Sequence, residues 1–357
     1  MTPADLSMTV LRAVRRAVDE NALHAPVPAR VRVERTRPGG RGDYASAVAL
    51  QLAGPAALTA REVAEILRER VARVPGIGRV EITGPGFLNF TLDPSADAHR
   101  ALVDRVREQG TRYGHGDALA GEPLRLRHAR EVRAAVTAHA VGALARAQGA
   151  VVHVGCDVAP DPDWVRLGIA GEAAEPSSTG TEIRPVPAGA TAGELLGRLG
   201  ADATRWGLLR PAGHDRAPLG DDLLVQGEAN ALFLVRYAHS RVHALNRAAG
   251  RLGFTSTPGQ EAVESPGAEA LALLALVADH PAVLASAARH RAPDRLARHL
   301  EAVARAFLDF QDTVSPLPVG DEKPSAAHRS RLALAEAAGT VLAGGLSLLG
   351  ISAPEHL

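Results

Sequence analysis

Lysine and cysteine are almost absent from this sequence of 357 residues. Arginine supplies all but one of the 40 Lys and Arg side chains, and the exception is Lys323. A mechanism that needs a lysine at any earlier position is therefore excluded. The single cysteine, Cys156, excludes an internal disulfide and a metal site built from several cysteines. One free thiol is typical of proteins in a reducing compartment.

Net charge and long apolar runs are missing as well. The 40 basic residues balance 40 acidic ones, so the chain is not a strongly basic nucleic-acid coat, although local patches remain open. The longest apolar run, around 271–278, is far shorter than the roughly 20 residues that span a bilayer. The N-terminus also lacks the basic and apolar regions of a signal peptide. We therefore expect a cytoplasmic protein that needs no cofactor or metal and binds neither membrane nor DNA.

The first segment, 1–120, mixes helical and strand patterns and predicts an α+β domain. Apolar spacing indicates helices over 4–21 and 94–109, and Thr59 with Glu62 forms a capping box that opens another. Alternating side chains predict a strand over 27–35. A short apolar stretch, 44–52, suggests a further helix. Two strands around Gly84-Pro85-Gly86, at 79–82 and 87–92, predict a hairpin.

The second segment, 121–200, predicts a single βαβ unit and a linker. The expected elements are a strand over 123–128, a helix over 131–148 and a strand over 150–155. The stretch 157–187 is rich in Pro, Gly, Ser and acidic residues, which is typical of a loop, and 191–199 predicts a short helix. One βαβ unit cannot cover both faces of a parallel sheet. The segment must lean on a neighbouring domain, or it is the remnant of a larger one.

The third segment, 201–357, is helical throughout and predicts an all-α bundle of about five helices. The apolar run 271–278 is expected to be buried on all sides. Pro281, Pro293 and Pro324 are expected at helix starts. In the helix over 293–313, apolar spacing places four residues inward (Leu296, Leu300, Val303, Phe307). Arg295, Arg298 and His299 should then point to solvent.

Two basic groups in this bundle are candidates for phosphate binding. One lies on a single helix, and the other spans a turn and the following helix; they comprise Arg236, His239, Arg241, His243 and Arg247, and then Arg289, His290, Arg291, Arg295, Arg298 and His299. Arginine and histidine can donate charge-assisted hydrogen bonds to phosphate oxygens. A solvated helix face explains the same residues equally simply, so both interpretations stay open.

Several motifs at the two ends of the chain resemble one family. Gly42-Asp43-Tyr44-Ala45-Ser46 and the run from Glu81 to Phe90 resemble the N-terminal additional domain of arginyl-tRNA synthetases. Three later stretches resemble the DALR-type anticodon-binding domain of the same family: Leu199 to Arg205, Tyr237-Ala238-His239 with Arg241, and Gly345 to Glu355. The motifs occur in the family's order. The resemblance implies this family's terminal domains, joined by a truncated class I catalytic domain.

The middle of the chain departs from that family. Its first signature, H-I-G-H, would fall at Arg125-Leu126-Arg127-His128, where the first His and the Gly are missing. Those His residues stabilise charge in the transition state, and the Gly lets ATP approach the backbone. The second signature loop uses lysines, and its place near 181–184 contains none. Segment 121–200, the stub, is therefore interpreted as a remnant of the catalytic domain without catalytic residues.

The resemblance implies three functional hypotheses. The first is a non-catalytic paralogue that binds tRNA, with tRNA-Arg expected, as an accessory or adaptor in translation. The tRNA-binding residues that the resemblance implies are Tyr44, Phe87 and Asn89 at the tRNA elbow and Tyr237, His239 and Arg241 in the anticodon-binding domain. The density of positive charge adds Arg291, Arg295 and Arg298 as candidate phosphate contacts. The second is a protein-interaction module that partners a full-length synthetase or a tRNA-modifying enzyme. The third, which the missing residues oppose, is a residual arginine–tRNA ligase.

Overall fold

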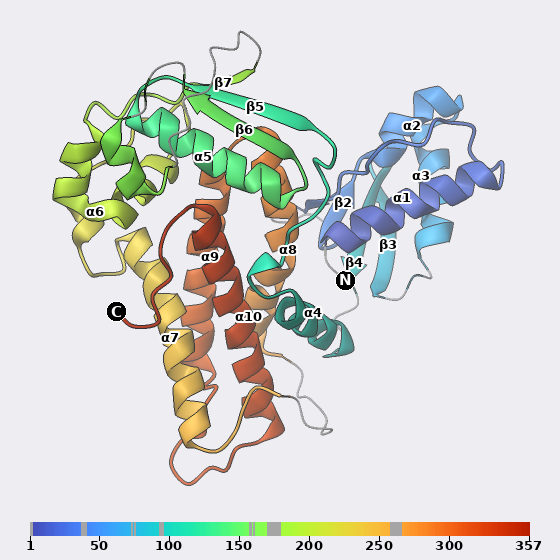
Figure 1. Cartoon of the computed structure of the whole chain (residues 1–357). Helices are drawn as coiled ribbons and strands as arrows, with labels where there is room; N and C mark the ends of the chain where they lie inside the picture. The colour runs from blue at the N-terminus through green and yellow to red at the C-terminus, as the bar shows by residue number, and fades with distance from the viewer. Residues whose placement is uncertain are drawn as a thin grey trace. The chain divides into compact units, whose positions relative to one another are not determined.

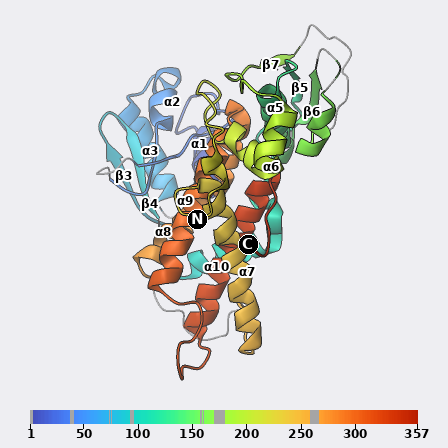
Figure 2. The same cartoon turned by 90° about the vertical axis from the view of Figure 1, so that its left-hand side faces the viewer.

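The chain divides into two compact units, residues 1–104 and residues 105–357. The structure is a computed structural model, shown in two views in Figures 1 and 2. It describes residues 3–36, 41–72, 74, 76–92, 96–156, 159, 161–169, 180–257 and 266–357. The α+β, α/β and all-α regions that the sequence predicts are all present, in that order. The division of the chain into separate domains near residues 120 and 200 stays a prediction.

The first unit is an antiparallel sheet of four strands covered by helices. The strands follow the order β1-β2-β4-β3. The elements are α1 (Pro3–Asp19), β1 (Glu34–Arg35), β2 (Tyr44–Ser46), α2 (Val48–Ala56), α3 (Ala60–Val71), β3 (Ile77–Thr83), β4 (Phe87–Leu92) and the first part of α4 (Ala96–Gln109). The predicted hairpin over β3 and β4 is confirmed, with Val80 opposite Phe90.

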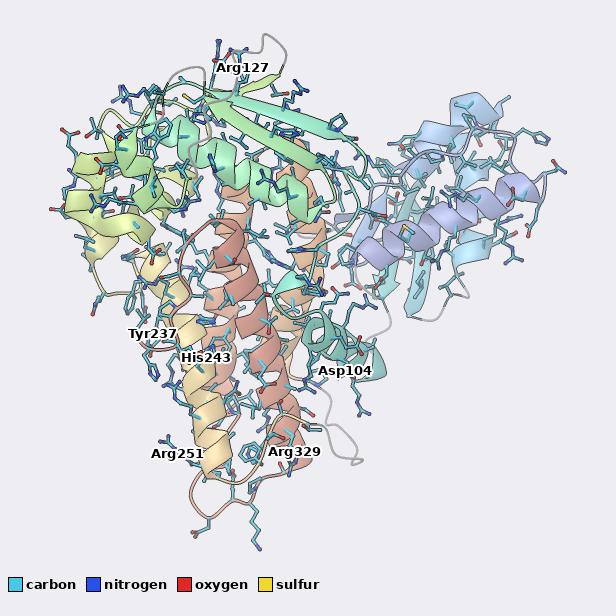
Figure 3. The ribbon with its side chains drawn as sticks, viewed as in Figure 1. Asp104, Arg127, Tyr237, His243, Arg251 and Arg329 are labelled. Atoms are coloured by element: carbon cyan, nitrogen blue, oxygen red, sulfur yellow. The ribbon has the colours of Figure 1, made fainter. Side chains whose placement is uncertain are left out.

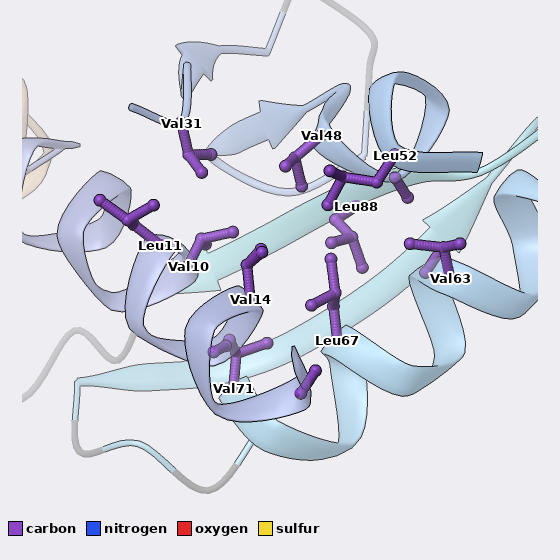
Figure 4. Close-up of a cluster of buried hydrophobic side chains, with 14 of the residues drawn as sticks. Val10, Leu11, Val14, Val31, Val48, Leu52, Val63, Leu67, Val71 and Leu88 are labelled. Atoms are coloured by element: carbon purple, nitrogen blue, oxygen red, sulfur yellow. The ribbon is translucent and has the colours of Figure 1, made fainter. Parts of the chain in front are cut away.

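An aliphatic core fills the space between α1, α3 and the sheet (Figure 4). Val14, Leu67 and Leu88 are fully buried there. The Thr59 capping box forms as predicted: the Glu62 amide donates to the Thr59 hydroxyl, and the Glu62 carboxylate accepts from the Thr59 amide. The burial of about 20 apolar side chains in this cluster is the dominant stabilising term for the unit.

Two local predictions in this unit were wrong. The strand expected over 27–35 is limited to Glu34–Arg35, because Pro26 and Pro28 lack the amide hydrogens that a strand uses for pairing. The helix expected from Tyr44 begins at Val48 instead. Tyr44–Ser46 pairs with β4 as strand β2, so pairing with a strand distant in sequence overrides the local apolar pattern.

The second unit joins a small parallel sheet to a helix bundle. Its sheet has the order β6-β5-β7. Its elements are η1 (Gly110–Arg112), β5 (Pro123–His128), α5 (Val132–Ala147), β6 (Val151–Cys156), η2 (Pro162–Leu167), β7 (Thr181–Ile183), α6 (Ala192–Leu209), η3 (Asp221–Leu224), α7 (Ala231–Arg251), α8 (Ala268–His290), α9 (Pro293–Thr313) and α10 (Ala326–Leu348). The predicted βαβ unit is confirmed as β5, α5 and β6.

The parallel sheet has one face covered by α5 and exposed polar side chains on the other face. Leu126 on β5 is buried against α5, whereas Arg125 and its register partner His153 on β6 are exposed. This alternation suits a sheet with one solvated face, which is unusual for parallel strands. The stretch expected as a loop contains η2 and β7, and β7 pairs with β5; residues 157–158, 160 and 170–179 of that stretch lie outside the described residues.

The helices α7 to α10 pack side by side in both views (Figures 1 and 2). Pro293 begins α9 as predicted, but Pro281 lies inside α8 rather than at its start. The expected short helix over 191–199 continues as α6 to Leu209 through a kink at Gly200, whose φ is 75°. The run 271–278 is not buried all round, because Leu271 is exposed. Among the described helices, α8 alone is long and apolar enough to cross a membrane, a property that core helices of bundles share.

Candidate nucleic-acid interface

The three residues implied at the tRNA elbow do not share one face of their sheet. Phe87 and Asn89 are two residues apart on β4 and therefore point to the same side. Tyr44 pairs with Phe90 and is buried on the core side, where the Arg35 guanidinium lies over its ring and donates to its hydroxyl. The Asn89 side-chain nitrogen donates to the Thr83 hydroxyl at 2.6 Å. Phe87 is the exposed member of the set, and its accessible ring suits stacking on an unpaired base.

The anticodon-side residues Tyr237, His239 and Arg241 all lie on α7 but in different surroundings. Tyr237 is exposed and stacks on Phe233 with ring centroids 5.6 Å apart. The Arg241 guanidinium donates to the side-chain oxygen of Gln311 on α9 at 3.3 Å. His239 is buried and contacts the chain's C-terminal residues instead. Tyr237 is therefore the side chain of this set most available to a ligand.

The C-terminal tail, residues 350–357, lies along α6 and α7 (Figure 1). The Ser352 amide donates to the Asp202 carboxylate at 3.0 Å, and the Ser352 hydroxyl contacts the same carboxylate. Arg236 approaches both Asp202 and Ser352. Beside this junction is a pocket of about 340 Å³ lined by parts of α6 and α7 and by Leu357. The last residue of the tail thus lines this pocket together with Phe233, the ring on which Tyr237 stacks.

Arg205, the last residue of the stretch from Leu199 to Arg205, connects three elements of the second unit. Its buried guanidinium donates to the carbonyls of Leu349 at 2.8 Å and Leu167 at 2.6 Å. It thereby joins α6, η2 and the end of α10. Burial lowers the pKa of Arg205 to about 10, which leaves it charged at neutral pH. Asp202 and Arg205 are structural anchors of the tail.

The cations at the turn between α8 and α9 have internal partners. Arg295 donates to the Ser286 hydroxyl at 2.9 Å, and Arg298 pairs with Asp294 at 3.3 Å. Arg291 is exposed and adopts a left-handed conformation with φ of 52°. The prediction that His299 faces solvent was wrong. Its ring is buried and stacked on His280 at 5.3 Å, because α8 covers a wider arc of α9 than the four inward residues indicate.

The resemblance places the first catalytic signature at His128, but this side chain is not presented to a ligand. Its ring is buried, lies 5.5 Å from the Trp164 ring and 6.3 Å from the His139 ring, and its Nδ1 is 2.9 Å from the Ala129 carbonyl oxygen. These contacts make it a core residue of the stub. Burial lowers the pKa of the neighbouring His139 to about 4, so that ring is neutral at neutral pH.

Arg133 on α5 is a residue that the sequence analysis missed. It is fully buried and donates to five backbone carbonyls, those of Leu208, Val186, Asp215, Pro211 and Ala212. Burial lowers its pKa, and no carboxylate is needed because carbonyl oxygens surround the guanidinium. The local signal for it was weak: an arginine in the first turn of a largely apolar helix that also carries His139 and Arg146. It fixes α5 to Val186, which precedes α6, to the end of α6 and to the segment that follows α6.

Comparison with known proteins identifies both ends of the chain. Residues 8–92 match the family model described as "Arginyl tRNA synthetase N terminal domain". Residues 235–357 match the one described as "DALR anticodon binding domain". The arginine–tRNA ligases of Renibacterium salmoninarum and Frankia alni are 27% and 26% identical to the chain, with all of each protein covered. Those alignments extend over 552 and 554 positions, so long stretches of both ligases have no counterpart in 357 residues.

Solved structures show the same fold. The arginyl-tRNA synthetase of Thermus thermophilus aligns with a TM-score of 0.63 at 14% identity, with all of both chains covered. The enzyme of Plasmodium falciparum aligns with a TM-score of 0.67 at 8% identity, with 99% of both chains covered. At these identities the likeness shows the fold alone. It agrees with the order of α+β, α/β and helical regions described above.

Proposed function

Because the chain belongs to the arginyl-tRNA synthetase family and is shorter than its relatives, we propose that it is a non-catalytic paralogue that binds tRNA. The N-terminal unit would contact the tRNA elbow, and the helical bundle would contact the anticodon stem and loop. We expect tRNA-Arg to be the preferred species and the cytoplasm to be the site of action. In this role the protein acts as an adaptor or accessory factor rather than as a ligase.

One observation carries the proposal: both tRNA-recognition domains are present, while the signature position between them contains a buried core histidine. His128 packs against Trp164 and is flanked by Arg125 and Arg127, where the family has a His and a Gly. The chain also has no lysine before position 323 to contact pyrophosphate. Retained binding domains with a replaced catalytic signature favour binding without chemistry.

The test measures binding and chemistry with the same purified full-length chain. Arginine-dependent ATP–pyrophosphate exchange should be absent, with the arginine–tRNA ligase of Frankia alni as the active control. Transcribed tRNA-Arg should bind at low salt, and its affinity should fall steeply as salt is added, because binding releases counterions from phosphates. Reproducible arginine-dependent exchange would contradict the absence of chemistry, and no tRNA binding at low salt would contradict the binding role.

A second candidate, a protein-interaction module, draws support from the cations of the bundle. Arg295 and Arg298 have internal partners, and the net charge of the chain is zero; both features weaken attraction to RNA. The partner in that case would be a full-length synthetase or a tRNA-modifying enzyme. Association through an apolar interface would respond weakly to salt, so the salt series distinguishes the two candidates.

A further inference from the structure

Two histidines one helical turn apart on α7 point their rings at each other. His239 and His243 are four residues apart, which places them on the same side of the helix. Their Nε2 atoms are 3.3 Å apart, and their ring centroids are 4.7 Å apart with a tilt of 59°. Figure 3 labels His243 on α7, six residues beyond Tyr237. The two Nε2 atoms therefore lie close together on one side of α7.

The C-terminal tail fixes the orientation of the first ring. The Nδ1 atom of His239 lies 2.9 Å from the Pro354 carbonyl oxygen. A carbonyl oxygen can only accept, so Nδ1 carries the hydrogen and Nε2 presents its lone pair. Metal-bound histidines are oriented in this same way by a carbonyl or carboxylate behind the ring.

The separation of the two nitrogens matches a chelate. Two Zn–N bonds of about 2.0–2.1 Å at a tetrahedral angle place the nitrogens about 3.3–3.4 Å apart. We propose that His239 and His243 form a bis-imidazole site for a divalent transition-metal ion of the Zn²⁺ class, at the contact between α7 and the C-terminal tail. His243 then takes the tautomer with its hydrogen on Nδ1.

The remaining coordination positions belong to water. Among the described residues, no group of three or more His, Cys, Asp or Glu side chains is gathered as a metal cluster, so the two imidazoles are the anchoring ligands. The negative charge of Glu355, which follows Pro354, acts on His239 and favours a cation there. Arg247, which contacts His356 at 3.4 Å, opposes it. A site of this kind binds more weakly than one with four protein ligands.

Calorimetric titration of the EDTA-treated full-length chain with ZnCl2 tests the site. Wild type should bind one equivalent, and Zn²⁺ should raise its Tm because the ion binds the folded state. His243→Asn should weaken binding by about tenfold or more, because an imidazole ligand is lost, and should remove the Zn²⁺-dependent rise in Tm. His214→Asn is the matched control, because the His214 side chain is 86% exposed in the same unit; it should bind as wild type does.

Two results would overturn the assignment. One is the absence of saturable binding at one equivalent, and the other is unchanged affinity in His243→Asn. Either would reduce the pair to a hydrogen bond between imidazoles. A lower Tm of metal-free His243→Asn would identify a folding defect, and His239→Gln, which keeps a polar side chain against the tail, then decides by the same titration. The assignment does not depend on tRNA binding, so neither result bears on the proposed function.

Discussion

The two units of this chain bury different kinds of side chain in their interiors. The first unit is filled by aliphatic side chains from α1, α3 and the sheet, such as Leu6, Leu67 and Leu88. The second unit also buries Arg133, Arg205, His280 and His299. The Arg133 guanidinium donates to the Asp215 carbonyl and the Arg205 guanidinium to the Leu167 carbonyl, so both connect the stub to the region that follows it. A shortened domain has few apolar layers to share with its neighbour, and buried arginines supply the connection instead.

This difference predicts distinct weaknesses in the two units. The first should respond to lost apolar volume and the second to lost hydrogen bonds or added protons. Both tryptophans, Trp164 and Trp206, are buried in the second unit, so tryptophan fluorescence reports on that unit alone. Hydrogen exchange over α3 reports on the first. The two readouts allow each unit to be followed in the intact chain.

Replacement of Arg133 should produce the largest effect of any single substitution. Arg133→Met removes the donor for five carbonyls, and each carbonyl left buried without a partner costs about 1–3 kcal/mol. We expect the free energy of unfolding of the second unit to fall by roughly 3–5 kcal/mol, measured from the urea dependence of tryptophan fluorescence. Exchange over α3 should not change. Arg130→Met, at an exposed site nearby, is the control, and equal losses in both variants would contradict the anchoring role.

Acid should weaken the second unit next. Burial lowers the pKa of His139 and His299 to about 4 and holds that of His280 well below its usual range. Between pH 6.5 and 4 the unfolded chain binds protons that these buried rings do not, so stability falls as the pH drops through that window. His299 alone accounts for about 3 kcal/mol. A fluorescence-detected urea midpoint that stays constant from pH 7 to 4.5 would contradict this account.

Helix caps give a smaller and symmetrical test. Thr59 opens α3 in the first unit and Thr191 opens α6 in the second, each with a capping box. Replacement of either by Ala should cost about 1 kcal/mol. Thr191→Ala should shift the fluorescence transition, and Thr59→Ala should shift only the exchange rates over α3. If each variant moves both readouts equally, the two units unfold together.

Local signals predicted much of the fold, and contacts between distant segments account for the errors. The hairpin around Gly84 and both strands flanking α5 follow from patterns a few residues long. Strand β7 has three residues and exists because Leu126 pairs with Thr181, which no local pattern encodes. His299 directly precedes the buried Leu300 on α9, and its ring is buried because it packs against His280 of α8.

Contacts between distant segments also explain why the candidate site was predicted only in part. The motifs placed Tyr237, His239 and Arg241 on one helix, as found. On that helix, Arg241 contacts α9 and His239 contacts the tail. The tail is held near α6 and α7 by the hydrogen bonds of Asp202 to Ser352 and of Arg205 to Leu349. The internal partners of Arg295 and Arg298 could not be read from the sequence either, because Ser286 lies on the preceding helix.

The most direct test of tRNA binding by the bundle is the salt dependence of that binding. Arg291→Ala, Arg295→Ala and Arg298→Ala together remove up to three phosphate contacts. The slope of log affinity against log salt should then shrink by roughly two, at about 0.7–0.9 per neutralised phosphate. The control replaces three exposed arginines of the stub, Arg125, Arg166 and Arg184, with the same change in charge, and should keep the wild-type slope. Equal slopes and affinities for wild type and both variants would contradict the account.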